Sequence, residues 1–109
     1  MQQYARDRAQ ELPGVGLKHP LGPDWEMFKA RDKVFMLLTE TTGEPIAILE
    51  ATPQDGKALW EQHEDITPGY HMNKQHWITL HPDGKLPKRL VEDLVHDSYD
   101  LATGAGKRS

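Results

Sequence analysis

The strongest periodic signal in the chain is an apolar stripe in its last third. After Pro87, apolar side chains recur at helical spacing for about four turns, with polar residues between them. The positions of this stripe are Leu90, Val91, Leu94, Val95, Leu101 and Ala102. The pattern predicts an amphipathic helix that packs on a core and is followed by a frayed tail over residues 104–109.

Two shorter helices are predicted upstream. Residues 4–12 carry a narrow apolar stripe on an otherwise charged segment, which a Pro-Gly pair ends. A second helix begins after Thr52, because a hydroxyl cap, a proline at the first helical position and an acid at the third favour a helix start. This helix is expected to run to His63.

Strand patterns fill the region between the first two helices. Residues 25–30 and 33–39 are rich in aromatic and apolar side chains and are separated by an Arg-Asp pair, which predicts a β-hairpin. Residues 46–49 are apolar on both faces, as is typical of a central strand. A turn-rich segment after the second helix contains further strand signal, including residues 76–81.

The predicted order is one helix, three strands, one helix, two strands and a last helix. Connections between consecutive strands are too short for parallel crossovers, so the sheet is expected to be antiparallel. The helices then cover one face of it, which gives a two-layer α+β arrangement. Residues 1–109 form one domain in this interpretation, because a chain of this length supports a single core.

Composition narrows the classes of protein and of site. A mean hydropathy of −0.72 with 28% charged residues fits a soluble domain. The longest apolar runs, residues 34–38 and 46–49, are far shorter than the roughly 20 residues of a membrane span. The first residues lack the apolar stretch of a secretory signal, and the absence of cysteine excludes disulfides, thiolate zinc sites and cysteine nucleophiles. We therefore expect a cytoplasmic protein that does not contact membranes.

One segment carries more specific information. Residues 68–77 read PGYHMNKQHW. This string resembles the signature of the MmcQ/YjbR family, in which PGYHMNK and HW precede a short strand, a DG turn and a terminal helix. Other family features fall in the same order here, including ELPG at 11–14, HPLG at 19–22 and DG at 83–84. The resemblance therefore covers residues 4–103.

The resemblance implies an α/β domain of the CyaY-like type and DNA binding through an arrangement called a double wing. It implies no general enzymatic reaction and no cofactor. Two positions depart from the family pattern, because Glu50 stands where relatives often have a lysine and Gln75 stands where many have a basic residue. Both departures lower the local positive charge.

Charge is distributed unevenly along the chain. Residues 66–89 contain four cations and one anion, a net charge of +3, whereas the rest of the chain carries −7. If the signature and the DG turn project together, these cations form a basic face that contacts phosphates, with hydrogen bonds from imidazoles and an amide and a stacking surface from a tyrosine. The predicted nucleic-acid or ligand site consists of Tyr70, His71, Asn73, Lys74, His76, Lys85, Lys88 and Arg89.

The strength of such binding follows from the number of phosphates contacted. Four contacts predict that affinity for DNA falls about a hundredfold between 50 and 200 mM salt. The alternative for the same cations is a solvated rim, which small charge clusters usually form. The total charge of −4 also differs from that of a dedicated nucleic-acid binder.

The other polar residues do not predict catalysis or a metal site. His71, His76 and His81 lie five residues apart, a spacing that alternates faces in a strand and rotates by about 140° in a helix, so they do not share one ion. Ser98 lies in the last predicted helix rather than in the strand-to-helix turn that exposes a nucleophile. No enzymatic activity, metal or cofactor is therefore expected.

Three further features are interpreted structurally or left open. Asp97 and Asp100 are interpreted as solvated or cap-forming acids. Trp77 is expected in the core, between the sheet and a helix. For residues 68–74, a polar structural knot and a ligand or partner site are both compatible with the sequence.

A second class of function stands beside DNA binding. An open sheet face would make the protein a protein–protein interaction or chaperone-like adaptor module, as a monomer or a homodimer. This hypothesis predicts a contiguous exposed apolar patch on the order of several hundred Å² on that face. A catalytic pocket lined by the signature ranks last, for lack of a nucleophile, a metal cluster or a phosphate loop.

Overall fold

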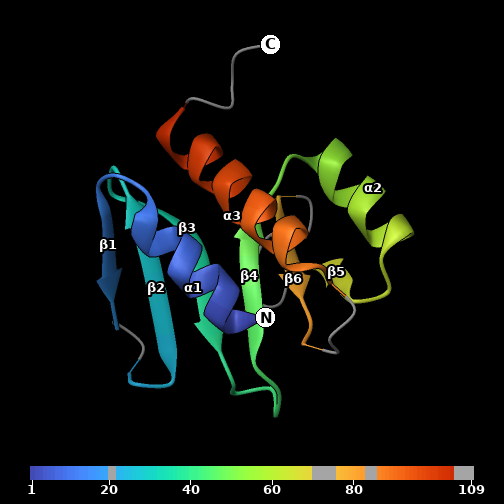
Figure 1. The fold of residues 1–109 in the computed structure, drawn as a ribbon, viewed down its shortest axis with the longest axis horizontal. Coiled ribbons are helices and arrows are strands. Elements are labelled where there is room, and N and C mark those ends of the chain that lie inside the picture. Colours follow the sequence, from blue (N-terminus) through green and yellow to red (C-terminus); the bar gives the residue numbers. More distant parts are fainter. Residues whose placement is uncertain (20–21, 70–75, 83–85, 105–109) are drawn as a thin grey trace.

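The computed structural model describes residues 1–19, 22–69, 76–82 and 86–104. It contains three helices and six strands within these ranges (Figure 1). In chain order they are α1 (Gln2–Glu11), β1 (Val15–Lys18), β2 (Trp25–Ala30), β3 (Lys33–Thr39), β4 (Ile46–Glu50), α2 (Pro53–Gln62), β5 (Ile66–Pro68), β6 (Trp77–Leu80) and α3 (Lys88–Thr103).

The six strands form one antiparallel sheet in the order β1-β2-β3-β4-β6-β5. All three helices lie on one face of this sheet (Figure 1). The α+β architecture predicted from the sequence is therefore confirmed. Among the described residues, no helix combines the length and the apolar character that a bilayer crossing requires.

The strand β1 is an addition to the predicted order. Its residues pair with β2 at the edge of the sheet, with Val15 opposite Ala30. The sequence VGLK is only four residues long and contains a glycine, which weakens strand propensity, and three of its four residues are exposed. Because an edge strand has one neighbour and little buried surface, its hydrophobic pattern is weak and the sequence did not predict it.

Local sequence signals explain the β2–β3 hairpin and the start of α2. The two turn residues Arg31 and Asp32 have φ of 51° and 63°, the left-handed pair that a tight two-residue hairpin requires. At α2, the Thr52 hydroxyl accepts a hydrogen bond of 3.2 Å from the Asp55 N–H, which satisfies one orphan donor of the first turn. Both features were predicted from the residues themselves.

The main core lies between the sheet and the helices. Its largest fully buried side chains include Phe28, Phe35, Leu49, Ile78 and Val95. A smaller cluster of Leu37, Ile46 and Ile48 occupies the opposite face, covered by the half-buried side chains of Trp25, Met27, Val34 and Trp77. Trp77 is thus packed, as predicted, but on the face away from the helices. The alternation along β6 explains this, since Ile78 and Leu80 take the helix-facing side.

A β-bulge in β3 is stabilised from α3. The register between β2 and β3 shifts after Phe28, which leaves Phe35 without an opposite residue. The hydroxyl of Ser98, fully buried on α3, donates to the Phe35 carbonyl at 2.5 Å and accepts from the Glu50 N–H at 2.9 Å. One serine therefore satisfies backbone groups on two strands.

The base of the β5–β6 hairpin requires a glycine. The Gly69 N–H donates to the Trp77 carbonyl at 2.8 Å. A Cβ on Gly69 would lie 2.5 Å from the Trp77 Cβ, far inside van der Waals contact. This part of the signature string has a structural reason, because only glycine allows the two chains to approach so closely.

Candidate functional site

Only part of the predicted nucleic-acid site lies in the described structure. Outside the described residues are Tyr70, His71, Asn73, Lys74 and Lys85. The exposed His76 precedes β6, and its carbonyl accepts a hydrogen bond of 2.9 Å from the Ala51 N–H. Lys88 and Arg89 are exposed in the first turn of α3.

The basic end of α3 is matched by carboxylates. A hollow of about 500 Å³ is lined by Arg8, Lys88 and Arg89 together with Glu92 and Asp93. Arg8 pairs with the Glu11 carboxylate at 3.0 Å, and the Lys88 Nζ lies 5.5 Å from the ring centroid of Tyr4. The net charge counted over residues 66–89 leaves out these acids. In the described part of the surface, the cations near α3 are therefore close to neutralised.

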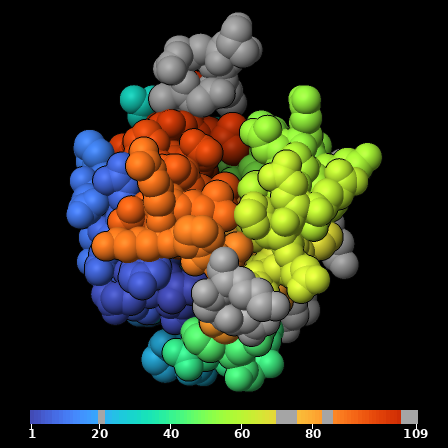
Figure 2. Space-filling model, turned by 45° about the vertical axis from the view of Figure 1, so that its right-hand side comes forward, coloured from blue at the N-terminus to red at the C-terminus, as the bar shows by residue number. Residues whose placement is uncertain are grey.

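A different site lies between α2 and α3. Both helices cover the same face of the sheet, but α2 packs on β5 rather than on α3 (Figure 1). A groove of about 530 Å³ remains between them, with Ala51 and Ile78 at its floor. Figure 2 views this side of the molecule, where the surfaces of α3 and α2 lie next to each other.

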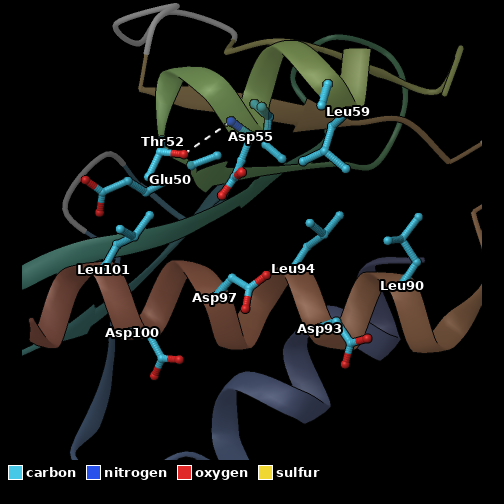
Figure 3. Close-up of a pocket in the computed structure, with 13 residues that line it drawn as sticks. Glu50, Thr52, Asp55, Leu59, Leu90, Asp93, Leu94, Asp97, Asp100 and Leu101 are labelled. Atoms are coloured by element: carbon cyan, nitrogen blue, oxygen red, sulfur yellow. Dashed lines mark hydrogen bonds between the residues drawn. The ribbon is translucent and has the colours of Figure 1, made fainter. Parts of the chain in front are cut away.

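Leucines form much of this groove, hereafter the α2–α3 groove. Along α3, Leu90, Leu94 and Leu101 follow one stripe, and Leu59 faces them from α2 (Figure 3). Leu94 is buried, whereas the other three are half-buried. The stripe has the spacing i, i+4, i+11, so the position at i+7 would complete an apolar row. That position is Asp97.

Carboxylates surround the leucines. Among the described residues that line the α2–α3 groove, five are acidic and none is basic: Glu50, Asp55, Asp93, Asp97 and Asp100. Figure 3 shows Asp55 pointing from α2 toward α3, and Asp97 between Leu94 and Leu101 in the row. The groove thus joins apolar walls to a negative rim, on which Asp93 and Asp100 point away from α2 (Figure 3).

The field of this rim acts on Asp97. Desolvation by burial raises the pKa of the Asp97 carboxyl, and the charges of Asp100, Asp93 and Asp55 raise it further, against a smaller opposite effect of His96. No hydrogen bond or ion pair to the Asp97 carboxylate exists within the described part of the chain. Its negative charge is therefore destabilised in the free protein.

One group in the described residues has the spacing of metal ligands. Side-chain atoms of His96, Asp97 and Asp100 lie within 4.8 Å of one another on a single turn of α3. The His96 Nδ1 is 3.3 Å from the Asp100 Oδ2, an i,i+4 pair that accounts for their proximity. Asp97 lies in the middle of α3 and Asp100 in its last turn, and Asp97 is exposed, which is the solvated alternative of the prediction.

A second constellation was missed from the sequence. The His81 Nδ1 lies 2.6 Å from Glu44 Oε1, and its Nε2 lies 2.9 Å from the Thr67 hydroxyl. Glu44 lies in the turn before β4, Thr67 in β5, and His81 directly after β6. Because both ring nitrogens are engaged, His81 ties these strand ends together. The partners lie 37 and 14 residues away, a separation that no local pattern reports.

Comparison with known proteins agrees with the fold. The family model described as YjbR matches residues 10–101. The chain belongs to the YjbR family. Among YjbR relatives, the Escherichia coli O157:H7 protein YbdF is 39% identical over 99% of this chain and 89% of its own length. The protein YjbR of Escherichia coli K12 is 34% identical over 80% of this chain and 75% of its own.

Solved structures extend the same agreement. A crystal structure of a Deinococcus radiodurans protein with a DUF419 domain is 31% identical, with a TM-score of 0.84 over 95% of this chain and 79% of that one. A crystal structure from Pseudomonas syringae is 30% identical, with a TM-score of 0.78 over 93% and 97%. The MmcQ/YjbR resemblance is therefore confirmed. None of these names states an activity, so YjbR membership leaves the function to be argued from the site.

Proposed function

We propose that this YjbR protein is an interaction module that binds a basic, apolar segment of a partner protein in the α2–α3 groove. One observation carries the proposal: leucines and four aspartates line the same groove, and none of its described lining residues is basic. This is the protein-interaction class predicted as the alternative to DNA binding, at a different surface from the open sheet face.

The helix-free sheet face supports an adaptor role less well. Its apolar side chains Trp25, Met27, Val34 and Trp77 are half-buried over the second cluster. The large apolar side chains with more than a third of their surface exposed are, among the described residues, Tyr4 and Leu17, which lie on α1 and β1. The α2–α3 groove supplies both a concave apolar surface and a charge for recognition, which the sheet face does not.

The energetics of the α2–α3 groove favour a cationic partner. Burying its leucine surface contributes about 25 cal/mol per Å² of apolar area, which supplies affinity without selectivity. The carboxylates repel one another in the free protein, and a partner lysine or arginine relieves that repulsion. Complementary charge at a rim acts mainly on association rate and on the choice of partner. A neutral or acidic apolar segment is therefore disfavoured.

The test is a titration with a designed probe. A labelled amphipathic peptide with leucine on one face and arginine beside it is compared, by fluorescence anisotropy, with a peptide that has glutamate at the arginine positions. The arginine peptide is expected to bind at micromolar concentration and more weakly at higher salt. Equal binding of both peptides, or binding of neither, overturns the proposal.

Matched variants locate the binding. The pair Asp55→Asn with Asp93→Asn removes two charges from the rim of the α2–α3 groove, and Asp7→Asn with Asp24→Asn removes two from exposed sites outside it. Only the first pair is expected to weaken binding of the arginine peptide. An equal effect of the second pair would mean that total charge, rather than the groove, attracts the probe.

Nucleic-acid binding is the second candidate, and one observation favours it. Arg8 adds a third cation to Lys88 and Arg89 in one hollow at the start of α3. Together with Lys74 and Lys85, which lie outside the described residues, these cations would contact a phosphate backbone.

Homodimer formation and a cytoplasmic location also stay predictions from the sequence.

Its test is binding of duplex and single-stranded DNA at low and at physiological salt. A Lys88→Gln/Arg89→Gln variant should lower affinity for all sequences alike and flatten the salt dependence. Absence of binding at about 50 mM salt, where backbone contacts are strongest, removes this candidate.

A further inference from the structure

Asp97 interrupts an otherwise apolar row on α3, and this position defines what the α2–α3 groove selects. We infer that Asp97 is the specificity-determining residue of this groove. It receives an arginine or lysine of a helical partner segment. An apolar side chain of that segment, seven residues from the cation, lies beside Leu90. The inference rests on the proposed function and deepens it, because it names the partner's chemistry and spacing.

The first support is that Asp97 has no structural task among the described residues. The stripe that holds α3 on the sheet consists of Val91, Val95, Ser98 and Ala102, all buried. The neighbouring stripe toward α2 contains Asp97, and its carboxylate makes no hydrogen bond or ion pair within the described structure. Alanine or leucine at this position would have higher helix propensity and would continue the apolar row.

The second support is the arrangement of charge around Asp97. On α3 its neighbours are Asp93, His96 and Asp100, and from α2 Asp55 adds a further repulsive charge. A cation placed at Asp97 is therefore attracted by several carboxylates at once, whereas a cation elsewhere along the leucine row meets fewer.

The spacing follows from helix geometry. Leu90 and Asp97 are two turns apart on one face of α3, which corresponds to about 10 Å along the axis. A helix lying in the groove along α3 then presents its cation and its apolar anchor at i and i+7. Amphipathic helices that enter apolar grooves use anchors with this repeat. The walls of the α2–α3 groove are themselves two helices, which suits an occupant of the same shape.

The experiment is a double-mutant cycle between protein and peptide. A helical peptide carries one leucine and one arginine seven residues apart on an alanine and glutamine background, and a second peptide has glutamine for the arginine. Wild type and Asp97→Asn are titrated with both. Asp97→Asn is expected to lower affinity for the arginine peptide about three- to fivefold and to leave the glutamine peptide unchanged.

Controls separate this inference from the proposed function. Asp24→Asn makes the same charge change at an exposed site outside the α2–α3 groove and should bind both peptides like the wild type. If the arginine peptide binds to the wild type and to Asp97→Asn equally, the role of Asp97 is wrong while the groove stands. If the wild type binds neither peptide, the proposed function fails as well.

The register has its own readout. A third peptide places leucine and arginine four residues apart with the same composition. The wild type is expected to bind it more weakly than the i, i+7 peptide. Asp97→Asn is expected to bind the two peptides with equal affinity. Equal affinity of the two spacings for the wild type would overturn the two-turn register. Urea unfolding of Asp97→Asn, expected to show no loss of stability, excludes misfolding as the cause of weaker binding.

Discussion

The two stripes of α3 differ in how each accommodates its polar residue. Toward the sheet, Ser98 stands among Val91 and Val95, and its hydroxyl bonds backbone groups of β3 and β4. Toward α2, Asp97 stands among leucines, and its carboxylate bonds nothing in the described structure. A polar residue in an apolar stripe that is fully hydrogen-bonded maintains the fold. One that is exposed in a groove without a partner is a candidate for binding.

The largest effect is expected for Ser98→Ala. Removing the hydroxyl leaves the Glu50 N–H and the Phe35 carbonyl unpaired in a buried place, which costs about 2–3 kcal/mol of unfolding free energy. Urea denaturation measures this change. Thr42→Val, which removes an exposed hydroxyl bonded to the Glu44 carbonyl, is the matched control and should cost far less. Similar losses of unfolding free energy in the two variants would show that Ser98 has no special structural role.

A smaller effect on stability is expected for Leu90→Ala. Leu90 is a half-buried residue in the wall of the α2–α3 groove. The substitution removes apolar surface from both the free protein and the complex. Unfolding free energy should fall by about 1 kcal/mol, less than for a fully buried leucine. Affinity for the arginine peptide should fall together with affinity for the glutamine peptide. A loss confined to the arginine peptide would place the cation, rather than the anchor, beside Leu90.

The smallest effect, and of opposite sign, is expected for Asp97→Asn. Because the pKa of Asp97 is raised in the folded state, ionisation of this group destabilises the native protein as pH rises through the carboxyl range. Asp97→Asn should therefore be more stable than the wild type at neutral pH, by no more than about 0.5 kcal/mol for an exposed site. The difference should vanish below the ordinary aspartate pKa of about 4.

Thermal or urea unfolding at several pH values checks this sign. Asp24→Asn, for which the same charge is removed outside the α2–α3 groove, serves as the reference. If the wild type is more stable than Asp97→Asn at neutral pH, Asp97 stabilises the fold, and its contrast with Ser98 disappears.

Much of the fold was predictable because its signals are local. The α3 stripe, the Thr52 cap and the two-residue turn before β3 each specify an element from a few neighbouring residues. The strand β1 was not predictable, because its four residues bury too little surface to leave a pattern. The face on which Trp77 packs was also missed, since its choice depends on which side of β6 the helices cover.

The candidate site was harder to predict than the fold. Its walls come from residues 50–59 and 90–101, which the sequence keeps far apart and only the fold brings together. One signal was present all the same: Asp97 occupies the i+7 position of a leucine row. The sequence analysis interpreted Asp97 as a solvated acid and did not consider it together with the leucines of that row. The predicted basic face instead relied on charges counted along the chain, without the acids that α3 places beside them.

The most direct test of the binding site is nuclear magnetic resonance of the labelled protein titrated with the arginine peptide. Backbone amide shifts are predicted to concentrate at Asp55, Leu59, Leu90, Leu94 and Asp97, on both walls of the α2–α3 groove. Shifts that gather instead at Arg8, Lys88 and Arg89, or on the strands around Trp25, would contradict the account.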